Sequence, residues 1–204
     1  MLKELFTELL HNYTNDDNRI IIYWTEIEKN YSGKGRYYHT LQHLDHLLNQ
    51  LIVVKSEIKD WDVVLFTLYY HDIVYNSRKS DNEEKSAELA EERMKQISVP
   101  AEVIELCKKQ ILATKSHLTA TDQDTNYFTD IDLSILGQDW NTYSDYYKNV
   151  RKEYAVYPDF LYNPGRKKVL QHFLAMDRIF KTDLLYDKFE LRARQNMQKE
   201  MELL

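Results

Sequence analysis

The sequence has 204 residues, which is long enough for one folded domain with a sizeable core. It contains only 4 glycines and 3 prolines, a composition that argues against sandwiches, barrels and glycine-rich phosphate loops. The net charge of −6 provides no overall positive field for nucleic acid or an anionic membrane surface, so an anionic substrate must be bound by local cations.

Apolar residues recur at helical spacing along almost the whole chain, and no strand-type alternation persists. The sequence therefore predicts an all-α fold, a single helical bundle over residues 1–204. The first six helices are expected around residues 2–10, 20–27, 40–54, 61–75, from 83 onward and 101–117. The fourth is apolar nearly all round, so it should form the buried centre of the bundle.

The C-terminal part continues the helical pattern after a polar interruption. The run TATDQDTNY, residues 119–127, is expected to be a loop. We then expect a short apolar segment at about 131–137 and a Tyr-rich helix at about 140–157. A further helix, opened by Pro164 and Gly165, is expected at about 164–180, and a last one from 183 onward. No linker is long enough to separate two domains.

The single cysteine, Cys107, cannot form an intramolecular disulfide or a cysteine-rich zinc site, and this suits a reducing compartment. No stretch approaches the ~18–20 apolar residues that a membrane helix needs, and the N-terminal segment lacks the pattern of a signal peptide. We therefore expect a soluble cytoplasmic protein, without a membrane or duplex nucleic acid as its partner.

Four of the seven histidines lie between positions 39 and 71. Residues four apart share a helical face, so His39 and His43 are expected to point the same way, with His46 continuing their stripe. This row of polar groups beside apolar ones would line a pocket. For an isolated HxxxH pair, the alternative is a set of partly exposed histidines that are hydrogen-bonded to their neighbours.

His71 and Asp72 lie in the apolar run FTLYYHDIVY, so both are expected to enter the core near the end of a buried helix. A buried charge must be paired or bound to a metal, because an unsatisfied one costs several kcal/mol. The alternative to metal binding is an Asp72 carboxylate that pairs with a lysine or arginine, or with a histidine of the third helix.

A third acidic pattern is Asp130-Ile131-Asp132, in which the two carboxylates face opposite ways. One of them is expected to face inward. For an isolated pattern of this kind, the alternative is a helix N-cap followed by an acid in the first turn.

In this order the segments resemble the HD superfamily of metal-dependent phosphohydrolases. RYYHTLQHLDHLL resembles its entry helix, FTLYYHDIVYN its His-Asp helix and TDIDLSILG its distal aspartate segment. With DNEEKSAELA, ILATKSH and RKEYAVYPDFLYNPGRKKVL, the resemblance extends from about Tyr23 to the C-terminus and points to an uncharacterised bacterial branch. It implies one HD-type helical domain, with a metal-site core at about 36–137 and C-terminal helices at 140–204 packing on that core.

YHTLQHLDHL is also similar to the YHNxxHAxDV signature of cyclic nucleotide phosphodiesterases, which are HD-fold enzymes. This similarity implies that His43 is a metal ligand and that His39 is the general acid. Likewise, Asp132 rather than Asp130 matches the aspartate segment of those enzymes. The chain departs from the family in having Thr40 instead of Asn and in lacking a Glu soon after the His-Asp pair, for which Glu83 is a candidate replacement.

The ligand set that the resemblance implies is His43, His71, Asp72 and Asp132. Two imidazoles and two carboxylates suit Mn, Fe, Co, Ni or Zn, with Mg also possible, and one or two ions per chain are expected. Candidates for binding the phosphoryl group are Arg36, Lys115, His117, Arg151 and Arg166. The alternative for each of the four cations is an ordinary surface role. The alternatives for His117 are a ligand of a second metal ion, a hydrogen-bond partner of a metal ligand, or a residue that ends a helix.

The expected function is hydrolysis of a phosphate ester or anhydride of a small metabolite, of which a nucleotide-like compound is one option, by metal-activated water. Two other classes remain open. A non-catalytic ligand-binding or regulatory domain would keep the fold without turnover, and a diiron oxygenase would need His46 and His117 as additional ligands.

Overall fold

Every regular element of the protein is helical in the computed structural model, which describes the whole chain, Met1–Leu204. There are ten α-helices, two short 3₁₀ helices and no strand, which confirms the all-α prediction. The chain divides into two compact units, residues 1–129 and 130–204. The expectation of a single HD-type domain over 1–204, with a site core at about 36–137, stays a prediction.

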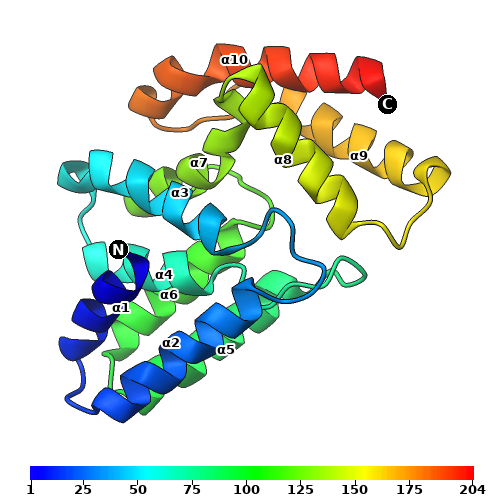
Figure 1. The fold of residues 1–204 in the computed structure, drawn as a ribbon. Coiled ribbons are helices and arrows are strands. Elements are labelled where there is room, and N and C mark those ends of the chain that lie inside the picture. The colour runs from blue at the N-terminus through cyan, green and yellow to red at the C-terminus, as the bar shows by residue number, and fades with distance from the viewer. The chain divides into compact units, whose positions relative to one another are not determined.

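The first unit contains the N-terminal helices and most of α7. The bounds are α1 (Leu2–His11), α2 (Asp17–Tyr31), α3 (Leu41–Val53), η1 (Lys55–Glu57), α4 (Trp61–Tyr70), α5 (Asn82–Gln96), α6 (Ala101–Ala113) and α7 (Gln123–Asp132). Helices α2 and α5 run side by side (Figure 1) and are joined by a forked ion pair, in which Arg93 donates to both carboxylate oxygens of Glu26. None of the helices in the chain is both long and apolar enough to cross a membrane.

Helix α4 is the buried centre of the first unit, as predicted. Its residues from Val63 to Tyr70 are all buried, and it contacts α1, α3, α5 and α6. Asp60 caps its N-terminus by accepting a hydrogen bond from the Val63 amide. The only cysteine, Cys107 of α6, is fully buried beside Thr67 of α4, and burial raises the pKa of its thiol to about 12.

The second unit consists of the end of α7 followed by four further elements. Their bounds are η2 (Leu133–Gly137), α8 (Trp140–Glu153), α9 (Asp159–Leu174) and α10 (Asp183–Leu203). Helix α10 contacts both η2 and α9. The contact with η2 is close: a Cβ atom on Gly137 would lie 2.5 Å from the Cβ of Phe189, so only glycine fits at this position.

The predicted loop at 119–127 is wrong in its second half, because α7 begins at Gln123. Asp122 caps this helix by accepting hydrogen bonds from the amide and hydroxyl of Thr125. Three of the polar residues that suggested a loop, Asp124, Thr125 and Asn126, are buried. Asp124 accepts from the amides of Lys59 and Asp60, at 2.7 Å in the closest case. Tertiary contacts therefore stabilise a helix whose local sequence is typical of a loop.

Several predicted helices have different ends. The fourth, the sixth and the Tyr-rich helix end at Tyr70, Ala113 and Glu153, several residues earlier than expected, and α9 covers 159–174 instead of 164–180. Helix α9 begins after Pro158, whose carbonyl accepts the first helical hydrogen bonds, so Pro164 lies inside it. Its C-terminus is fixed by Arg194 of α10, which donates to the Leu174 carbonyl at 3.0 Å.

Candidate functional site

His39 and His43 lie on either side of the start of α3. The N-cap residue Thr40 has an extended backbone (φ −116°, ψ 178°), so the helix begins at Leu41 and His39 precedes it. The prediction that the two histidines share one helical face is therefore wrong. The two imidazole centroids are nevertheless 5.8 Å apart, so the bend at Thr40 keeps the rings adjacent.

His71 and Asp72 directly follow the last residue of α4. The His71 amide still donates to the Thr67 carbonyl, and the imidazole Nδ1 lies 3.1 Å from the Leu68 carbonyl oxygen. Because a carbonyl can only accept, Nδ1 carries a proton and donates it. In the neutral ring this tautomer leaves the lone pair on Nε2, which is the atom directed at Asp72.

Three imidazole nitrogens converge on one carboxylate oxygen in the first unit. Asp72 Oδ2 lies 3.2 Å from His71 Nε2, 3.8 Å from His43 Nε2 and 3.9 Å from His39 Nε2. The Nε2 atoms of His43 and His71 are themselves 3.4 Å apart. In the neutral ring, His71 Nε2 presents a lone pair to the Asp72 carboxylate, an arrangement that a shared proton or a cation stabilises. Imidazole and carboxylate together are a donor set that fits a first-row divalent ion.

The cluster is closed on one side and open on the other. The side chains of His43 and His71 are each 1% exposed, whereas those of His39 and Asp72 are 20% and 19% exposed. The two buried imidazoles thus lie against the core of the unit. His39 and Asp72 form the side that a small molecule from solvent would meet first.

Aromatic rings that sequence reasoning did not single out surround these histidines. His39 lies between Tyr38, at 4.9 Å between centroids, and Tyr75, at 4.4 Å with an interplanar angle of 31°. The Phe128 ring packs nearly perpendicular to that of His71, with 5.4 Å between the centroids. Two of these rings could have been found from the sequence, because Tyr38 directly precedes His39 and Tyr75 ends the HDIVY run.

Arg36, predicted to bind the phosphoryl group, uses its guanidinium within the first unit. Nη1 donates to the His39 carbonyl at 3.0 Å and Nη2 to the Ile73 carbonyl at 2.9 Å. The guanidinium carbon lies over the rings of Tyr31 and Tyr75, at 4.8 Å and 5.3 Å. Arg36 therefore joins the segment of His39 to the segment that follows Asp72.

The two acids of the DID pattern belong to the second unit and differ in their surroundings. Asp130 is fully buried; its Oδ1 accepts from the Lys181 amide at 2.9 Å, and its Oδ2 accepts from the amide and hydroxyl of Thr182, each at 2.8 Å. The Lys181 ammonium lies 3.2 Å from the same carboxylate. Asp132, the last residue of α7, is half-buried. Asp130 thus anchors the turn before α10, and it is Asp132 that remains the predicted ligand.

Arg166, another predicted substrate-binding residue, lies in a buried network of the second unit. It forms a forked pair with Glu200, with Nε 2.7 Å from Oε1 and Nη2 2.9 Å from Oε2. The Tyr143 hydroxyl donates to the same carboxylate, and burial raises the pKa of this tyrosine. Arg166 is 8% exposed. These contacts give Arg166 a structural role in joining α9 to α10, and its substrate role stays a prediction.

Arg151 also has structural partners in the second unit. It donates to the carbonyls of Tyr154 and Tyr157, at 3.0 Å and 2.9 Å, and forms an ion pair with Asp159 at 2.7 Å. The guanidinium therefore fixes the turn between α8 and α9. Binding of a phosphoryl group by Arg151 stays a prediction.

Lys115 and Glu83 are near each other in the first unit. The Lys115 ammonium donates to the Ser80 carbonyl at 2.7 Å, pairs with Glu84 at 2.5 Å and lies 4.0 Å from Glu83. The Glu84 pairing raises the pKa of Lys115. Glu83 lies in the first turn of α5. The catalytic role of Glu83 and the substrate role of Lys115 remain predictions.

His46 and His117 are the other histidines considered as ligands. His46 is half-buried on α3. His117 follows α6 in a left-handed conformation (φ 54°), with its amide bonded to the Ala113 carbonyl. This backbone ends the helical turn, which agrees with the helix-end alternative for His117. A second metal site built from these residues stays a prediction.

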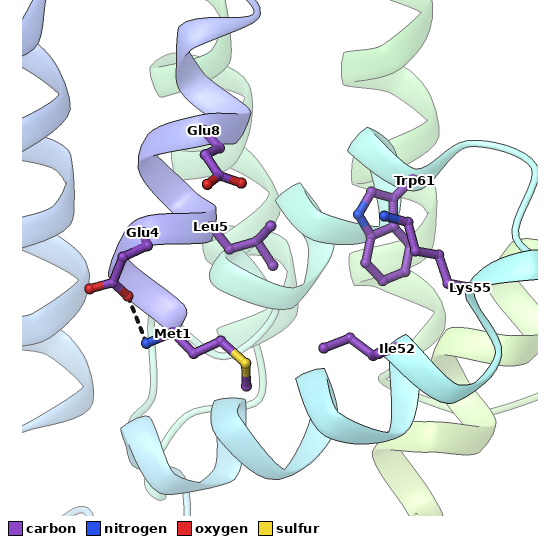
Figure 2. A pocket seen from close by; sticks show the side chains of 7 residues that line it. All are labelled: Met1, Glu4, Leu5, Glu8, Ile52, Lys55 and Trp61. Carbon is purple, nitrogen blue, oxygen red and sulfur yellow. Dashed lines mark ion pairs between the residues drawn. The ribbon is translucent and has the colours of Figure 1, made fainter.

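The first unit also has a shallow groove of about 530 Å³ between α1 and the stretch that runs from the end of α3 through η1 to the start of α4. Figure 2 shows Leu5 and Glu8 of α1 on one side and Ile52, Lys55 and Trp61 on the other. None of the predicted site residues lines it. The histidine cluster and this groove are therefore separate features of the unit.

Comparison of the chain with protein families, with curated proteins and with solved structures finds no match. The residues of the histidine cluster and their chemistry are therefore the basis for assigning a function.

Proposed function

We propose that the protein is a metal-dependent phosphohydrolase that cleaves an ester or anhydride bond of a small phosphorylated metabolite. The observation that carries this proposal is the convergence of three imidazole Nε2 atoms within 3.9 Å of Asp72 Oδ2. The order of the motifs along the chain, which resembles that of the HD superfamily, supports the same assignment.

In this proposal His43, His71 and Asp72 hold a divalent ion, with Asp132 as the fourth ligand. Two imidazoles and two carboxylates fit Mn, Fe, Co, Ni or Zn, and leave positions on a six-coordinate ion for other molecules. The full use of Asp130 by Lys181 and Thr182 supports the choice of Asp132. The ion would acidify a water molecule and polarise a phosphoryl oxygen.

His39 is the proposed proton donor. Its Nε2 lies 3.9 Å from Asp72, a longer distance than that of His71, and its ring is the most exposed of the three. It can therefore reach a substrate that is held beside Asp72. Protonation of the leaving-group oxygen as the ester bond breaks is typically worth 10²–10⁴-fold in rate.

The test is metal analysis of the purified full chain, followed by hydrolysis of a panel of phosphomonoesters, diesters and anhydrides. We expect about one or two divalent ions per chain and turnover of at least one ester class. His71→Ala should lose both. The matched control is His11→Ala, which makes the same change at an exposed position of the same unit. Bound metal without turnover of any ester would instead favour a non-catalytic ligand-binding domain.

A further inference from the structure

We propose that Arg36 is a positioning residue that holds His39 beside Asp72, rather than a cation that binds the substrate. This inference rests on the proposed function, because it concerns the histidine assigned there as proton donor. It changes the role expected for Arg36 from the sequence, and it follows from the contacts that the guanidinium makes.

The first contact set joins two distant segments of backbone. The two terminal nitrogens of Arg36 donate to carbonyls of His39 and Ile73, at 3.0 Å and 2.9 Å. Ile73 directly follows Asp72, and it lies 37 positions from Arg36 in the sequence. Both ends of the planar fork are thus directed at the main chain, on either side of the cluster. A lysine has one ammonium group on a flexible stem and lacks this fixed two-pronged geometry.

The second contact set is aromatic. The Arg36 guanidinium carbon lies 4.8 Å from the Tyr31 centroid and 5.3 Å from that of Tyr75. The Tyr75 ring also stacks on His39 at 4.4 Å, and the Tyr31 hydroxyl accepts from the Asp72 amide at 3.3 Å. Each neighbour of the guanidinium therefore contacts His39 or Asp72, or is the residue after Asp72.

These contacts predict a specific kind of defect. Because Arg36 holds the backbone of His39, its loss should let the His39 ring move relative to Asp72. His43 and His71 lie on α3 and directly after α4, and the Asp72 amide is held separately by the Tyr31 hydroxyl, so metal binding should change little. The reaction should suffer most where a proton must be delivered, since a misplaced catalytic group loses much of its effect even when displaced by about 1 Å.

The experiment compares Arg36→Lys with wild type in the full chain loaded with Mn²⁺. We expect a loss of roughly tenfold or more in kcat for phenyl phosphate, but less than about threefold for p-nitrophenyl phosphate, whose phenolate leaves unaided. The Mn²⁺ content should stay at the wild-type value. The control is Arg78→Lys, the same change at an exposed arginine of the 76–81 loop, which should alter neither rate.

A double-mutant cycle with His39→Ala separates positioning from direct binding. If Arg36 acts through His39, Arg36→Lys should cost less than about twofold once His39 has been removed. Equal loss on both substrates, a raised KM with kcat unchanged, or full additivity with His39→Ala would each overturn the proposal and return Arg36 to substrate binding. If Arg36→Lys does not fold, Tyr75→Leu removes the ring that Arg36 and His39 both contact and should give the same pattern.

A readout without turnover distinguishes this inference from the proposed function. In the metal-free chain, the ¹H–¹⁵N imidazole signals of His39 should shift or broaden in Arg36→Lys, while those of His43 and His71 stay in place. If wild type hydrolyses no phosphate ester, the proposed function fails, and this NMR result alone decides the positioning role. Unchanged His39 signals would overturn it.

Discussion

Two regions of the molecule each contain an aspartate among other polar groups, and the two carboxylates have opposite neighbours. Asp130 in the second unit is surrounded by donors: two amides, a hydroxyl and an ammonium group. Asp72 in the first unit faces three imidazole nitrogens, and at least one of them, His71 Nε2, carries a lone pair in its neutral form.

The difference separates a structural carboxylate from a candidate ligand. A carboxylate whose oxygens are filled by fixed donors contributes to folding and has no capacity left for a cation. A carboxylate that meets imidazoles leaves a site whose charge balance improves when a cation binds. Burial and residue type alone do not make this distinction, since Asp130 is the more buried of the two.

The largest expected effect comes from removing an imidazole beside Asp72. His71→Ala should lower divalent-metal affinity by roughly 100-fold or more and remove the stability that metal binding adds, because ligand binding couples to folding. Mass-spectrometric metal content and thermal unfolding with and without a chelator measure both. A variant that keeps wild-type metal and loses only activity would show that the ligand assignment is wrong.

The next test compares Asp130→Asn with Asp72→Asn in the metal-free chain. Asparagine at 130 places an amide donor against the existing donors and leaves the buried Lys181 without its charge partner, so unfolding free energy should fall by about 3–5 kcal/mol. Asp72→Asn should cost less than about 1 kcal/mol without metal. Urea denaturation gives both values, and equal losses would remove the distinction between the two regions.

Asp132→Asn should have an intermediate effect on metal binding. One ligand of four is weakened, so we expect a loss of about tenfold in metal affinity, equivalent to about 1.4 kcal/mol. Titration with Zn²⁺ against a chromophoric chelator measures this value, with the residual metal content of folded Asp130→Asn as the comparison. If Asp130→Asn loses metal while Asp132→Asn keeps it, the ligand role belongs to Asp130.

The smallest effect is expected for Lys181→Met. Burial of the ammonium lowers the pKa of Lys181, although Asp130 acts in the opposite direction. Because Asp130 keeps three hydrogen-bond donors and the desolvation cost of the ammonium is removed, exchange of the ammonium for a thioether should change the unfolding free energy by about 1 kcal/mol or less. Denaturation midpoints check this, and a loss as large as that of Asp130→Asn would make the ion pair the main stabiliser of the region.

Much of the fold could be predicted from the spacing of apolar residues. The periodicity located the helices, and the apolar run from 61 onward identified α4 as the buried centre. The errors occur where a distant part of the chain decides the structure. The start of α7 depends on Asp124 bonding to the amides of Lys59 and Asp60, and the end of α9 depends on Arg194. Such contacts leave no local pattern.

The histidines of the site could be predicted because chemistry restricts them to few residue types. Their neighbours could not. Arg36 was predicted as a cation for the substrate, but its acceptors are the backbone carbonyls of His39 and Ile73. Every residue has such a carbonyl whatever its side chain, so the sequence does not indicate which ones an arginine will bind. The break between His39 and α3 was likewise missed, because Thr40 adopts an extended backbone that sequence spacing does not reveal.

The deep burial of Cys107 has a practical consequence. The chain contains no other thiol, and this one is fully enclosed with its pKa raised to about 12, so almost none of it is thiolate at neutral pH. Alkylating reagents and maleimide dyes should therefore leave the folded wild-type protein unlabelled. A cysteine introduced at an exposed position, such as that of Arg78, would then be the only thiol that reacts in the folded protein. The native Cys107 would not have to be removed first.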